Sequence, residues 1–215
     1  MSIRRHIENF AKELRPGSRV LDVGCGLRPY EHFFVKSQYL GIDVETSGRK
    51  PGDKLPDQFY DGVRIPFGND EFDAIICTQV LEHCVDLNAI VSDFRRVLKA
   101  DGRLFVTVPF IWGEHEPPYD FRRFTSFGVK KLLEDHGFEI TDFHKLSAGI
   151  SAIEVLVESE KTHFMKEHPR AGLIMKVLSR VERLLWGALI RLWRKMYRFD
   201  RIYLDNVVVA SLVKS

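Results

Sequence analysis

The sequence predicts an α/β domain built on a doubly wound, mainly parallel sheet. Short apolar runs that end in an acidic residue or a glycine turn recur along the chain, as at 19–24 and 39–44, and such runs are typical of buried parallel strands. Segments with apolar residues at helical spacing stand between them, which gives the alternation that βαβ units require. The length of 215 residues and the hydrophobic content of 45% suit one such domain.

The expected elements follow the same alternation along the chain. Strands are predicted at 19–24, 39–44, 72–77, 102–109, 138–146 and 206–213, with a weak strand at 58–60. Helical segments are predicted at 3–14, 30–35, 87–98 and 126–136, and a long helical stretch at about 165–199. Asp101-Gly102 is expected to stop the helix at 87–98, and 110–125 is expected to be a long loop.

The composition excludes several classes of protein. The formal net charge of +2 is too small to indicate nucleic-acid binding by the whole chain. Three cysteines without framework spacing argue against a disulfide scaffold and indicate reduced thiols in a cytoplasmic protein. No pair of the CxxC type accompanies Cys77, His83 and Cys84, so we expect no metal site and metal-independent catalysis. No signal peptide and no membrane-spanning apolar run are visible.

The central motif is VLDVGCG at residues 20–26. Asp22 ends the first predicted strand, and Gly24 and Gly26 allow a sharp turn that lets the backbone approach a ligand. Asp43 closes the next strand about 20 residues later, where a carboxylate can accept both hydrogen bonds of a ribose diol. Each residue alone has an ordinary structural explanation, either as a turn glycine or as a helix cap, but together they predict a nucleotide-type cofactor site.

Further segments extend this motif in register: GID at 41–43, DGVRIPF at 61–67 followed by FDAI, and QVLEH at 79–83. With VLDVGCG they resemble the class I S-adenosylmethionine (SAM) dependent methyltransferases, specifically the small-molecule group often called type 11. The resemblance covers roughly residues 18–147. It implies SAM as the cofactor and a seven-stranded Rossmann-like sheet whose last strand is antiparallel, with a helical insert before that strand.

The resemblance also implies the residues that bind SAM. They are Asp22, Gly24, Cys25, Gly26, Asp43, Val44, Asp61, Gly62, Thr78 and Gln79. Asp22 and the glycine turn would hold the amino-acid end, and Asp43 the ribose. Val44 would pack on the adenine, while Asp61 accepts from its amino group beside the Gly62 backbone. Thr78 and Gln79 would flank the methyl-bearing sulfonium.

One position departs from the family pattern. The third glycine of the motif usually stands near position 28, where this chain has Leu27-Arg28-Pro29. An NAD-binding GxGxxG fingerprint would need glycine at position 29, and proline there offers no N–H and no close helix packing. An NAD-dependent oxidoreductase is therefore disfavoured, and it would also lack a YxxxK-like catalytic pair.

Two histidines follow predicted strands at the edge where ligands bind in such sheets. His83 and His115 are candidate general bases for an acceptor that must lose a proton. The alternatives are that His83 fixes the loop beside Glu82 and that His115 bonds to Glu114 or Glu116 in a lid. The surrounding segment, HEPPYDFRRFT, resembles a stretch found in a subset of bacterial type 11 methyltransferases, and its Tyr119, Asp120 and Arg123 are candidates for substrate contact or for holding the lid closed.

The chain is expected to divide into a SAM-binding core at 1–160, a basic amphipathic helical insert at 161–201, and the final strand of the core at 202–215. The insert carries eleven lysines and arginines against three acids, with Trp186 and Trp193 seven positions apart. Such a helix could lie on an anionic membrane surface at the inner face, pack on the sheet, or form a homodimer contact.

The predicted function is methyl transfer from SAM to a small-molecule acceptor or a glycan or lipid-linked one, on oxygen or nitrogen. No nucleic-acid partner is expected, because no recognised motif accompanies the basic face. A non-catalytic SAM-binding or scaffold protein on the same fold is the main alternative, because fold and cofactor do not fix function.

Overall fold

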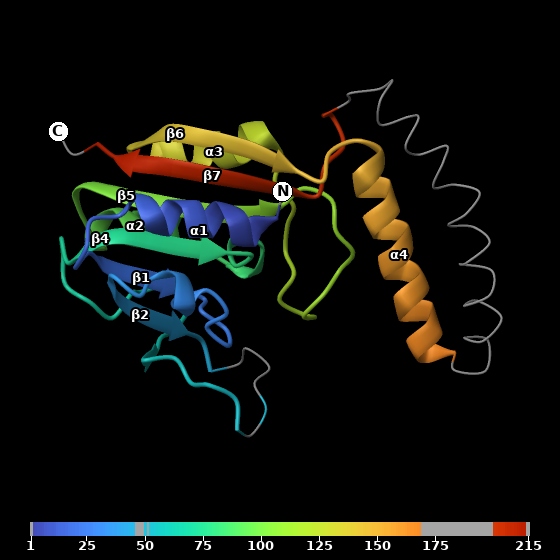
Figure 1. Ribbon diagram of the computed structural model, residues 1–215, viewed down its shortest axis with the longest axis horizontal. Coiled ribbons are helices and arrows are strands. Elements are labelled where there is room, and N and C mark those ends of the chain that lie inside the picture. The colour runs from blue at the N-terminus through green and yellow to red at the C-terminus, as the bar shows by residue number, and fades with distance from the viewer. Residues whose placement is uncertain (1, 46–49, 51, 169–199, 214–215) are drawn as a thin grey trace. The chain divides into compact units, whose positions relative to one another are not determined.

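A computed structural model describes residues 2–45, 50, 52–168 and 200–213. Its sheet has seven strands in the order β3-β2-β1-β4-β5-β7-β6 (Figure 1). The chain falls into two compact units, one formed by 1–110, 114–146 and 205–215, the other by 111–113 and 147–204. The first unit contains the whole sheet.

The strands lie close to their predicted positions. They are β1 Arg19–Val23, β2 Gln38–Asp43, β3 Gln58–Phe59, β4 Phe72–Thr78, β5 Leu98–Pro109, β6 Phe138–Leu146 and β7 Asp205–Leu212. The pairs β1–β2, β1–β4, β2–β3 and β4–β5 are parallel, whereas β7 runs antiparallel to both β5 and β6. The predicted fold class, with its antiparallel last strand, is confirmed.

Helices cover both faces of the sheet (Figure 1). Helix α1, Ile3–Glu13, packs Ile7 and Phe10 onto Val20 and Phe105. Helices α2, Leu87–Val97, and α3, Ser126–Asp135, cover the opposite face around Leu21. Alternate residues of β1 therefore enter opposite cores. Each fully buried side chain of this size stabilises the fold by roughly 1.5–3 kcal/mol.

Two local predictions were wrong. The connection from β1 to β2 has only a 3-10 turn, Glu31–Phe33, where a helix at 30–35 was expected. Helix α2 ends at Val97 rather than at Asp101-Gly102, because β5 already begins at Leu98, which is fully buried and pairs with Phe72. Asp101 has a φ of 60° inside an irregular part of this strand. Sheet pairing and burial overrode the turn signal.

In the second unit the described helix is α4, Ile150–Glu167, which begins well before the predicted helical stretch. Two backbone hydrogen bonds lie within this unit. The Ile111 amide donates to the Leu204 carbonyl at 3.2 Å, and the Gly149 amide donates to the Ile202 carbonyl at 2.7 Å. Residues 169–199, which hold Trp186, Trp193 and most of the predicted insert, lie outside the described residues. None of the described helices combines the length and apolar character that a membrane crossing needs.

Candidate cofactor and active site

The glycine turn follows β1 directly and closes over the end of β2. The amides of Gly24 and Cys25 both donate to the Ile42 carbonyl, at 2.9 and 3.0 Å. Gly24 has a φ of 71°, and a Cβ there would stand 2.3 Å from Val80 Cγ2. Only glycine fits this position, both in backbone conformation and in space.

Asp43 lies at the carboxyl end of β2 and ties the turn to it. Its Oδ2 accepts from the Gly26 amide at 2.9 Å and its Oδ1 from the Val44 amide at 2.8 Å. Each carboxylate oxygen can accept more than one hydrogen bond. The carboxylate is thus fixed in orientation at the carboxyl end of β2, where the resemblance places the ribose.

Asp22 is buried at the centre of the predicted amino-acid end of the cofactor. The Tyr39 hydroxyl donates to its Oδ2, while Oδ1 has no hydrogen-bond partner and the residue is 1% exposed. Burial, partly opposed by the Tyr39 hydrogen bond, raises the pKa of the Asp22 carboxyl to about 7. A cationic group such as the ammonium of SAM would satisfy the orphaned oxygen, so these residues fit that cofactor.

The residues predicted to bind the adenine also lie at one place. A Cβ on Gly62 would lie 3.4 Å from Val44 Cγ1, so these two residues are neighbours. Asp61 Oδ1 accepts from the Val63 and Arg64 amides at 2.8 and 2.7 Å, and these bonds lower the pKa of its carboxyl. The Asp61 side chain therefore stabilises the turn at 61–64 and is exposed to solvent as an ionised hydrogen-bond acceptor.

Thr78 ends β4, and Gln79 follows it with a φ of 55°. The Gln79 amide donates to the Thr107 carbonyl at 2.9 Å, and its side-chain Nε2 to Thr107 Oγ1 at 3.0 Å. Both residues are therefore held at the carboxyl end of the central strands, where the resemblance places the sulfonium.

Arg28 explains the departure from the glycine pattern. It has a φ of 59°, the left-handed conformation that glycine favours. Its guanidinium pairs with Asp57 at 2.9 Å and with Glu31 at 3.1 Å, and lies over the Tyr39 ring. The loop therefore keeps the left-handed backbone geometry that a glycine would adopt, and the Arg28 side chain links the turn to Asp57, directly before β3.

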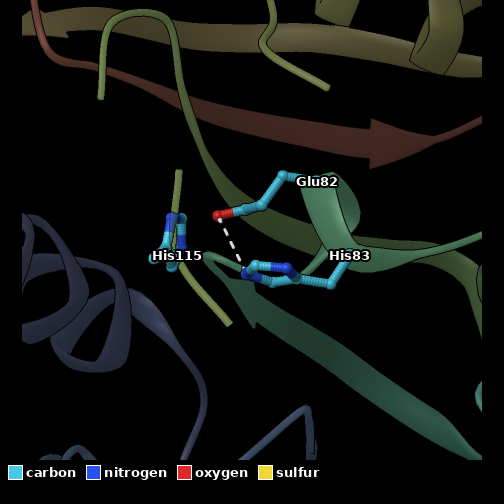
Figure 2. A group of neighbouring side chains, drawn as sticks. All are labelled: Glu82, His83 and His115. Carbon is cyan, nitrogen blue, oxygen red and sulfur yellow. Dashed lines mark ion pairs between the residues drawn. The ribbon is translucent and has the colours of Figure 1, made fainter. Parts of the chain in front are cut away.

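His83 and His115 meet beyond the carboxyl ends of β4 and β5, beside Glu82 (Figure 2). Their ring centroids are 4.8 Å apart at an interplanar angle of 85°. Glu82 Oε1 lies 3.9 Å from His83 Nε2. The Glu82 side chain is fully buried and neither of its oxygens has a hydrogen-bond partner. Burial raises the pKa of this carboxyl to about 8.

The segment that contains His115 is fastened to the β4 end. His83 Nδ1 bonds to the Tyr119 carbonyl at 2.8 Å, and the Phe121 amide donates to the Glu82 carbonyl at 3.0 Å. Asp120 accepts two hydrogen bonds from Arg123, at 2.6 and 2.7 Å, and lies 3.3 Å from His115 Nδ1. The Arg123 guanidinium holds the pKa of Asp120 well below its usual range.

The sequence identified His83 and His115 but not Glu82 as a site residue. The signal was present in QVLEH, where Glu82 directly precedes His83. Tyr39, which bonds to Asp22, was also missed, and nothing in its strand context distinguishes it from a packing aromatic. The three cysteines are buried and form no disulfide, and burial raises the pKa of Cys84 to about 11, as expected of inert thiols.

Comparison with known proteins places this fold in a family. The seven-stranded sheet with antiparallel β7, the glycine turn after β1 and the acid at the end of β2 define the class I methyltransferase architecture. A family model described as a methyltransferase domain matches residues 2–142. The chain belongs to this family of SAM-dependent methyltransferases, and SAM is the family's cofactor, which confirms both predictions from the sequence.

Individual relatives agree with this membership. A sterol 24-C-methyltransferase of Gibberella zeae is 32% identical over 71% of this chain and 43% of that protein, so the chain spans less than half of its length. The ubiquinone/menaquinone biosynthesis C-methyltransferase UbiE of Chromobacterium violaceum is 24% identical over 69% of this chain and 78% of that protein.

Solved structures share the fold at low identity. The [4+2]-cyclase SpnF has a TM-score of 0.64 at 21% identity, over 99% of this chain and 82% of that one. Phosphoethanolamine N-methyltransferase 2 of Haemonchus contortus, in complex with SAM, has a TM-score of 0.62 at 16% identity, over 98% of this chain and 52% of that one. These likenesses support the fold alone.

Proposed function

We propose that this protein transfers the methyl group of SAM to an oxygen or nitrogen atom of a small-molecule acceptor, which includes a glycan or lipid-linked one. The observation that supports this most is the meeting of His83 and His115, with ring centroids 4.8 Å apart, beyond the ends of β4 and β5. A hydroxyl or ammonium acceptor must lose a proton, and imidazole is the side chain best suited to take one near neutral pH.

The residues of the chain bind and align the reactants. Bound SAM supplies the electrophilic methyl group. Asp43 holds the ribose through a carboxylate fixed by two backbone amides, and the unpartnered oxygen of Asp22 accepts a hydrogen bond from the ammonium. Alignment of acceptor and methyl group on such a fixed platform contributes up to roughly 7–11 kcal/mol of barrier reduction.

The hydrogen bond of His83 fixes a tautomer that suits proton transfer from the acceptor. A carbonyl can only accept, so the bond to the Tyr119 carbonyl places the proton on Nδ1. Nε2 of the neutral ring then presents its lone pair on the side of Glu82, 3.9 Å away. This lone pair can act on the acceptor directly, by taking its proton, or through a bound ion.

The segment 114–125 is proposed to hold the acceptor. Tyr119 is 50% exposed although its backbone is bonded on both sides, so its ring can contact a substrate at low entropic cost. Asp120 and Arg123 are engaged with each other, which supports a positioning role for both rather than direct contact.

The relatives point to a competing acceptor class. The two named relatives methylate carbon in a sterol and in ubiquinone or menaquinone biosynthesis, so C-methylation of a lipid-like acceptor is the competing outcome. Peripheral membrane contact or homodimerisation through 161–201 would suit such an acceptor, but both remain predictions because most of that segment lies outside the described residues.

The test is formation of S-adenosylhomocysteine from SAM, with a panel of a sterol, a quinol and a sugar nucleotide, and a product mass increase of one methyl group. We expect His115→Ala to slow turnover by roughly 10²-fold, while His144→Ala, an exposed histidine on β6, leaves it unchanged. A methyl group found on carbon would contradict the O- or N-methylation proposal. Cofactor binding without turnover of any acceptor would favour a non-catalytic SAM-binding protein.

A further inference from the structure

We propose that Glu82, His83 and His115 bind one divalent transition-metal ion of the Zn²⁺ type. The binding itself does not depend on methyl transfer, whereas its use in catalysis rests on the proposed function. This proposal departs from the metal-independent catalysis expected from the sequence, where His115 stands far from His83 and no ligand spacing is visible.

The geometry is close to that of a metal site. One ligand atom from each of the three residues lies within 4.8 Å of the others, and Glu82 Oε1 and His83 Nε2 are 3.9 Å apart. Metal bonds of about 2.0–2.2 Å in tetrahedral geometry place ligand atoms about 3.3 Å from one another. The side chains therefore need to close by roughly 1.5 Å at most, which rotamer adjustment can supply.

The burial of the Glu82 carboxyl group without a hydrogen-bond partner favours a bound cation at this position. The Glu82 side chain is fully buried, and neither oxygen has a hydrogen-bond partner. An unpaired buried carboxylate is costly, and native proteins pair such groups with a cation or a hydrogen-bond donor. The charge of Arg123 acts on Glu82, but the hydrogen bonds of its guanidinium include two to Asp120.

In both histidines Nδ1 has a contact of the kind that orients a metal-binding imidazole. His83 donates Nδ1–H to the Tyr119 carbonyl at 2.8 Å, which directs Nε2 toward Glu82 (Figure 2). His115 has the Asp120 carboxylate 3.3 Å from its Nδ1. Metal-bound histidines usually donate their second nitrogen to a backbone carbonyl or a carboxylate in this way.

The ligand set selects the class of ion. Two imidazoles and one carboxylate suit Zn²⁺ and its first-row neighbours, whereas Mg²⁺ and Ca²⁺ prefer oxygen ligands alone. Three protein ligands leave a coordination position open, as in catalytic zinc sites. An acceptor hydroxyl bound there would lose its proton to solvent water more easily, because the cation stabilises the oxyanion.

The experiment measures binding of Zn²⁺ to untagged, chelator-treated protein by calorimetry, with the visible absorption of Co²⁺ as a second readout of imidazole coordination. Glu82→Gln, His83→Ala and His115→Ala are compared with His144→Ala, a surface histidine beside Asp142. Near-ultraviolet circular dichroism and S-adenosylhomocysteine binding, measured in parallel, show that each variant is folded and keeps its cofactor site.

We expect one Zn²⁺ per chain at micromolar affinity or better, a loss of at least about 10-fold in each cluster variant, and no change in His144→Ala. Absence of binding by the folded wild type would overturn the proposal. So would binding that persists in all three cluster variants, since the ion would then lie elsewhere. A protein that binds Zn²⁺ here but fails to bind S-adenosylhomocysteine would instead contradict the proposed function alone.

Discussion

Asp22 should make the stability of the protein depend on pH in a way that one substitution removes. Its carboxyl is 1% exposed, and its pKa is raised from 3.8 to about 7 in the folded protein. A raised pKa means that the folded state binds the extra proton. The stabilisation is therefore fully present below about pH 4 and is lost as the pH rises through about 7.

The size of the effect follows from the two pKa values. One pKa unit corresponds to about 1.4 kcal/mol, so the change from 3.8 to about 7 amounts to at most about 4 kcal/mol between pH 4 and pH 8. Asp22→Asn keeps the shape and the acceptor for the Tyr39 hydroxyl but cannot ionise. The variant should therefore gain stability relative to wild type as the pH rises, by about 2–3 kcal/mol between pH 5 and pH 8.

Urea unfolding followed by circular dichroism at pH 5, 6, 7 and 8 measures this difference. The control is Asp61→Asn, because Asp61 is exposed and backbone hydrogen bonds lower its pKa. Asp61 is ionised in both states over this range, so its substitution should have the same effect at every pH. Parallel pH profiles for wild type and Asp22→Asn would refute the argument that burial holds this carboxyl protonated.

Two further substitutions test the turn and the 114–125 segment. Gly24→Ala should destabilise the protein by roughly 2–5 kcal/mol, from left-handed backbone strain and the 2.3 Å approach to Val80, measured by thermal unfolding; an unchanged melting temperature would contradict it. Asp120→Asn should lower the free energy of unfolding by about 2 kcal/mol, because Arg123 loses its ionised partner. It should also make the segment 114–125 more susceptible to limited proteolysis. Protection equal to that of the wild type would show that other contacts hold this segment.

The sequence predicted most of the sheet because buried parallel strands have a local signature. Asp22 and Asp43 were placed correctly at or near strand ends because an acid that follows an apolar run and precedes a turn marks the carboxyl edge. The start of β5 at Leu98 could not be predicted in this way, since it depends on pairing with Phe72, a contact distant in the chain. Local turn chemistry at Asp101-Gly102 pointed elsewhere.

The active-site cluster depended even more on contacts that no local pattern reports. His83 and His115 come together because the Tyr119 carbonyl and the Phe121 amide fasten their loop to the β4 end. Glu82 becomes notable only when its burial without a partner is known. Residue type and strand position therefore predicted where the proposed cofactor residues lie in the fold, but not the grouping of Glu82 with His83 and His115.

The most direct test of the account is calorimetric binding of S-adenosylhomocysteine to the wild type and to Asp43→Asn, with Asp142→Asn on exposed β6 as the matched control. The single oxygen of an amide side chain cannot accept from both backbone amides and from the ribose diol, so two charge-assisted bonds of about 1.5–3 kcal/mol each are weakened. We expect micromolar binding by wild type and control, and a loss of at least about 10²-fold in Asp43→Asn. Failure of the folded wild type to bind, or equal binding by Asp43→Asn, would contradict it.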